Sequence, residues 1–93
     1  MRLTEYEILN IKEIVNNFDC KAKIYLFGSR IDDTKKGGDI DLLVISDNLT
    51  FKEKRLIKLQ LYNKLGEQKI DLIITKEPEN YFQKIALAEG ILL

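Results

Sequence analysis

The chain has 93 residues, with 15 basic and 15 acidic side chains that cancel, and it contains no histidine. This length predicts one domain, residues 1–93, with a modest core. The balanced charge argues against a nucleic-acid partner, and no apolar run approaches the length of a membrane span. Without histidine, Ser-His and Cys-His nucleophiles and imidazole zinc sites are excluded, so any catalysis would depend on carboxylates, Lys, Arg, Ser or Tyr.

The N-terminal stretch MRLTEYEILN carries acidic residues where a secretory signal would have an apolar segment. Cys20 is the single cysteine, so the chain cannot form an internal disulfide. Both features predict a cytoplasmic protein.

The first predicted element is a helix over residues 4–18. Thr4 followed by Glu7 forms a capping-box pattern, and apolar residues then recur at helical spacing. A short β-branched and aromatic stretch over residues 22–27 predicts a strand that Gly28 stops. Residues 29–34 are expected to form a short helix or turn, and residues 35–38 a loop.

The second half of the chain predicts two more strands and two more helices. Residues 39–46 and 69–75 read as buried strands, residues 50–65 as a helix ending at Gly66, and residues 78–88 as a final helix. The crossover between the last two strands is long enough for parallel pairing, whereas the first two can run antiparallel. We therefore expect an α/β fold (α+β in some schemes), with a small mixed three-stranded sheet flanked by about four helices.

Three aspartates interrupt the apolar strand patterns. Asp39 and Asp41 are two residues apart and so project from one face of their strand. If the next strand is a parallel neighbour, Asp71 comes level with this pair. Clustered carboxylates are costly unless they bind a cation or hold a proton, and hard oxygen ligands favour Mg²⁺ or Mn²⁺. The alternatives are that Asp39 and Asp41 are solvated strand-entry residues and that Asp71 pairs with a lysine.

Gly28 and Ser29 end the first predicted strand, next to the start of the second if the two are antiparallel. Glycine allows a ligand to approach the backbone closely, which suits a phosphate group. Arg30, Lys35 and Lys36 follow and are available for further phosphate contacts. A phosphate site beside a carboxylate-held metal is typical of phosphoryl or nucleotidyl transfer.

The ordered set FGSR, GGDIDL and a later Asp in KIDLIIT resembles the minimal nucleotidyltransferase (MNT) family of the DNA polymerase β-like superfamily. The resemblance covers nearly the whole chain and implies the nucleotidyltransferase fold. It implies that Gly28 and Ser29 contact the nucleotide phosphates and that Asp39 and Asp41 hold the divalent metals. It also implies that Asp71 assists the metal and the attacking hydroxyl.

The resemblance further implies a role in the cell. MNT proteins are commonly encoded with a helical HEPN partner and act as antitoxins, some of them by transferring AMP from ATP to the partner. We therefore expect a Mg²⁺-dependent nucleotidyltransferase that uses ATP, modifies a hydroxyl of a partner protein and forms a hetero-oligomer with that partner. The alternatives are a non-catalytic antitoxin that acts by surface contact and a domain that binds nucleotide without turnover.

Overall fold

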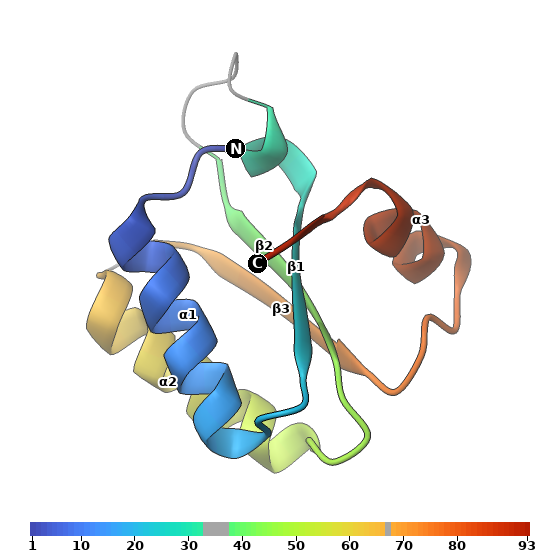
Figure 1. The fold of residues 1–93 in the computed structure, drawn as a ribbon, viewed down its shortest axis with the longest axis horizontal. Coiled ribbons are helices and arrows are strands. Elements are labelled where there is room, and N and C mark those ends of the chain that lie inside the picture. The colour runs from blue at the N-terminus through green and yellow to red at the C-terminus, as the bar shows by residue number, and fades with distance from the viewer. Residues whose placement is uncertain (33–37, 67) are drawn as a thin grey trace.

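The computed structural model describes residues 1–32, 38–66 and 68–93. Its elements form three layers, with helices α1 (Glu5–Phe18) and α2 (Phe51–Leu65) on one face of a sheet and helix α3 (Tyr81–Glu89) on the other (Figure 1). None of the helices in the described part of the chain has the length and apolar character that a membrane span requires. The predicted α/β architecture is confirmed.

The sheet contains strands β1 (Lys23–Phe27), β2 (Ile40–Ile45), β3 (Ile70–Thr75) and β4 (Ile91–Leu92), in the order β3-β2-β1-β4. As predicted, β1 and β2 are antiparallel and β2 and β3 are parallel. The prediction of three strands was wrong by one, because the chain returns after α3 and adds β4 antiparallel to β1. A strand of two residues is too short for an alternating pattern to reveal it.

The helix prediction also needs a correction. Three of the four predicted helices are α-helices. The short element predicted at residues 29–34 is a 3-10 turn, η1 (Gly28–Ile31), and residues 33–34 lie outside the described part of the chain. Both capping boxes form. The Glu7 backbone N–H donates to Thr4 Oγ1 (3.1 Å), and the Thr50 backbone N–H donates to Glu53 Oε1 (3.2 Å). Helix α3 begins at Tyr81, later than the predicted start at residue 78, because Asn80 caps it.

The sheet is buried on both faces, as the continuous apolar run of β2 predicts. Alternate β2 residues, Ile40, Leu42 and Val44, pack in the larger core cluster with α1 and α2. Leu43 packs in a smaller cluster with Phe27 and Ala86 on the α3 side. Because side chains alternate between the faces of a strand, Asp41 projects to the α3 side.

Candidate active site

The three predicted aspartates converge. Asp41 in β2 stands directly opposite Asp71 in β3, and Asp39 precedes β2 by one residue. One carboxylate oxygen from each of the three can be chosen so that all lie within 4.8 Å of one another. Parallel register between two short strands therefore brings together acids that are far apart in the sequence.

The cluster strongly perturbs Asp41. Burial, a hydrogen bond with Asp71 and the charges of Asp71 and Asp39 raise the pKa of Asp41 from 3.8 to about 6. Lys69 opposes this shift, and its Nζ lies 3.5 Å from Asp39 Oδ2. This ion pair is largely exposed to solvent and so contributes little stability. The three carboxylates lie close together, and Lys69 is a positive charge beside them. Oxygen ligands at this spacing suit Mg²⁺ or Mn²⁺.

Gly28 fits against this cluster because it has no side chain. Its φ is +76°, in the left-handed region that favours glycine. A Cβ at this position would overlap the Asp41 carboxylate. The glycine thus lets the end of β1 approach the carboxylates directly, as a close ligand approach requires.

The structure does not bring the Arg30 guanidinium to the three aspartates. Its Nη1 donates to the Arg2 carbonyl oxygen (2.8 Å), its Nη2 to Gln68 Oε1 (3.0 Å) and its Nε to the Gly38 carbonyl oxygen (3.3 Å). The guanidinium therefore joins η1 to the N-terminal segment, to the residues before β2 and to the residues before β3. The predicted phosphate contacts of Arg30 and of Ser29, which lies in η1, stay predictions. Lys35 and Lys36 lie outside the described residues.

A cavity of about 350 Å³ opens beside the cluster. Asp41 and Asp71 line it together with Phe27, Leu72 and Ile73 from the sheet, Lys54 and Lys58 from α2, and Phe82 from α3. Phe27 and Phe82 meet edge to face, with ring centroids 5.8 Å apart. The size lies within the usual range of small-molecule pockets, about 300–1,000 Å³. Two carboxylates, two ammonium groups and an aromatic wall therefore share one space.

Sequence reasoning missed Lys54, Lys58 and Phe82 as site residues. The two lysines are one helical turn apart, so they lie on the same side of α2. That spacing was a usable signal. Their position beside Asp71, however, follows from how α2 packs against β3, which the sequence pattern does not determine.

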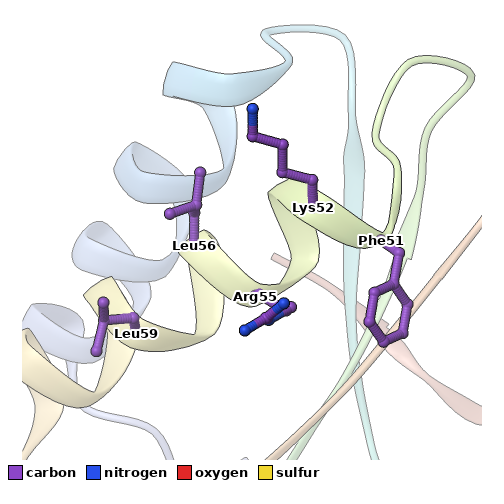
Figure 2. A pocket seen from close by; sticks show the side chains of 5 residues that line it. All are labelled: Phe51, Lys52, Arg55, Leu56 and Leu59. Carbon is purple, nitrogen blue, oxygen red and sulfur yellow. The ribbon is translucent and has the colours of Figure 1, made fainter.

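A larger cavity, about 560 Å³, lies elsewhere along α2 and contains none of the three aspartates. Figure 2 shows its lining side chains, Phe51, Lys52, Arg55, Leu56 and Leu59. If cavity volume were the only criterion, this larger cavity would be chosen as the candidate active site. The convergence of ionisable groups selects the smaller cavity as the candidate active site.

Comparison with known proteins identifies the family of the chain. A family model described as polymerase beta, nucleotidyltransferase, matches residues 9–93. The comparison with curated proteins found no match. The matched residues include every element that supplies the cluster, from the end of β1 to β3. With its three clustered aspartates and Gly28 packed against them, the chain belongs to the polymerase beta nucleotidyltransferase family.

Proposed function

We propose that the protein transfers a nucleoside monophosphate, AMP from ATP, to a hydroxyl group of a partner protein. The observation that supports this most directly is the approach of Asp39, Asp41 and Asp71 to within 4.8 Å. Membership of the family supports nucleotidyl transfer in general. The nucleotide, the protein acceptor and the antitoxin role rest on the resemblance to the MNT family.

The reaction forms a bond between the acceptor oxygen and the α-phosphorus of ATP. The bond from this phosphorus to the oxygen that bridges to the β-phosphate breaks, and its electron pair leaves with pyrophosphate. Asp39, Asp41 and Asp71 would hold the divalent cation, which when bound neutralises phosphate charge and makes the acceptor hydroxyl more acidic. We assign the acceptor proton to the Asp71 carboxylate, at the cavity wall. The phosphates are proposed to lie at the β1 end, where Gly28, which has no Cβ, packs against the Asp41 carboxylate.

The partner would be a helical protein of the HEPN type, which the chain neutralises as an antitoxin. Large apolar side chains on two helices are exposed and available for docking. On α3 these are Tyr81 (80% exposed) and Phe82 (59%), and on α2 they include Phe51 (73%). Such exposed apolar residues are typical of surfaces that contact another protein when they form a continuous patch.

The test is to incubate the protein with Mg²⁺, ATP labelled on the α-phosphate and the product of the neighbouring reading frame. Label on the partner, lost in Asp41→Asn, is the expected result. A Lys12→Gln variant on α1 serves as a control that should keep full activity. Complex formation without labelling would contradict the enzyme proposal and favour the alternative, an antitoxin that acts by contact alone.

A further inference from the structure

We propose that Lys54 and Lys58 recognise an acidic sequence around the acceptor hydroxyl, so that the favoured acceptor is a peptide segment rich in Asp and Glu. This inference rests on the proposed function and names the class of acceptor. It depends on the cavity that these lysines line together with Asp41 and Asp71.

Lys54 and Lys58 differ from the other basic residues of α2. Both are half-buried, whereas Lys52, Arg55 and Lys64 are exposed. A half-buried lysine packs its aliphatic stem against the protein and keeps its strongly hydrated ammonium group at the surface. The described carboxylates form no ion pair with either lysine, and Lys54 Nζ instead lies 5.9 Å from the ring centroid of Phe51. The two ammonium groups are therefore available to an anion in the cavity.

The aspartates do not fill this role once a cation is bound. Asp41 and Asp71 line the same cavity, but a divalent ion would neutralise their charge. The two lysines would then keep their positive charge in the cavity without a carboxylate to balance it. An incoming anionic group would complete the charge balance.

The position of the cavity points to the acceptor rather than the nucleotide. The strand order places β1 on one side of β2 and β3 on the other. Gly28, where the phosphates are proposed to lie, follows β1 and does not line the cavity. Asp71, to which we assign the acceptor proton, lines it. The acceptor would thus enter beside Asp71, in a cavity that Phe27, the residue before Gly28, also lines.

An acidic peptide fits this cavity better than a nucleic acid. Proteins that bind nucleic acid through its backbone contact several phosphates with a broad basic surface. Here the chain carries no net charge, and among the basic residues that the structure describes only Lys54 and Lys58 line the cavity. The aromatic wall formed by Phe27 and Phe82 offers an apolar contact for the peptide side chain.

The test measures binding of fluorescent hydroxyl-containing peptides by anisotropy, with Mg²⁺ and a non-hydrolysable ATP analogue present. We expect a Glu-flanked peptide to bind more tightly than its Gln-flanked analogue. The double variant Lys54→Gln and Lys58→Gln should weaken binding of the acidic peptide roughly tenfold, the loss expected for charge-assisted contacts. The matched double variant Lys12→Gln and Lys64→Gln removes two exposed lysines outside the cavity and should bind like the parent.

Three results would overturn the inference. The first is equal binding of acidic and neutral peptides by the parent protein. The second is a Lys54/Lys58 variant that loses affinity for the ATP analogue instead of the peptide, which would assign the lysines to the nucleotide. The third is tighter binding of a short oligothymidylate than of the acidic peptide. Asp41→Asn separates this inference from the proposed function, because it should abolish transfer yet retain the preference for acidic peptides.

Discussion

Replacing Asp41 with Asn should stabilise the metal-free protein at neutral pH. Asn has nearly the same shape, can still form a hydrogen bond with Asp71, and carries no charge. The raised pKa of Asp41, about 6 against 3.8 for the ordinary group, means that the folded state holds the proton more tightly than the unfolded state. Stability from this group is therefore fully present below pH 3.8 and is lost as the pH rises through about 6.

The size of the effect follows from the shift. About two pKa units correspond to at most about 3 kcal/mol. Asp41 is partly exposed, so solvent screening reduces this figure to about 1–2 kcal/mol. For a domain of this size, a gain of about 1 kcal/mol raises Tm by about 4–8 °C.

The assay is urea unfolding of the parent and Asp41→Asn in EDTA at a series of pH values from about 4 to about 8. The difference in unfolding free energy should grow as the pH rises and level off above about pH 7. Using the difference between the two proteins cancels the titration of the shared carboxylates that do not interact with Asp41. A variant that is no more stable than the parent at pH 8, or a difference that does not change with pH, would refute the reasoning.

Three further predictions address the cation, the glycine and a buried acid. Mg²⁺ should raise the Tm of the parent but not of Asp39→Asn, in a thermal melt with EDTA as reference; equal stabilisation of both would exclude Asp39 as a ligand. Gly28→Ala should cost about 1–3 kcal/mol in urea unfolding and more than Gly66→Ala, because both have positive φ but only Gly28 abuts Asp41; equal costs would contradict this. Ser46→Ala should cost about 1–3 kcal/mol, because Ser46 Oγ donates to Asp19 Oδ2 (2.6 Å). That bond lowers the pKa of Asp19, so its stabilisation fades as the pH falls, and Ser46→Ala should flatten the acid limb of the stability curve.

Much of the fold was readable from local patterns. The capping residues Thr4 and Thr50 and the apolar spacing of the helices that they begin predicted α1 and α2 almost to the residue. The direction of each strand pair followed from the length of its connection. Strand β4 was not predicted because its pairing with β1 depends on the position of the chain after α3. No local sequence pattern determines that position.

The acidic part of the site was predictable for a different reason. An Asp inside a buried strand conflicts with its surroundings, so Asp41 and Asp71 stood out, and alternation along the strand gave their shared face. The placement of Arg30 was not readable, because its partners Arg2 and Gln68 are distant in the sequence. The positions of Lys54 and Lys58 in the cavity could not be predicted either, because charged residues on a helix ordinarily face solvent.

The pairing of Asp41 with Asp71 also has a consequence for how the chain could diverge. Strand β3 carries apolar residues on both faces, and Asp71 is its single acidic position. A slip of one residue against β2 would turn that carboxylate into the packed layer beneath α1 and α2, where an ion is very costly. Asp71 therefore disfavours a shifted register between β2 and β3. A descendant in which Asp71 became apolar would lose this penalty against misaligned pairing.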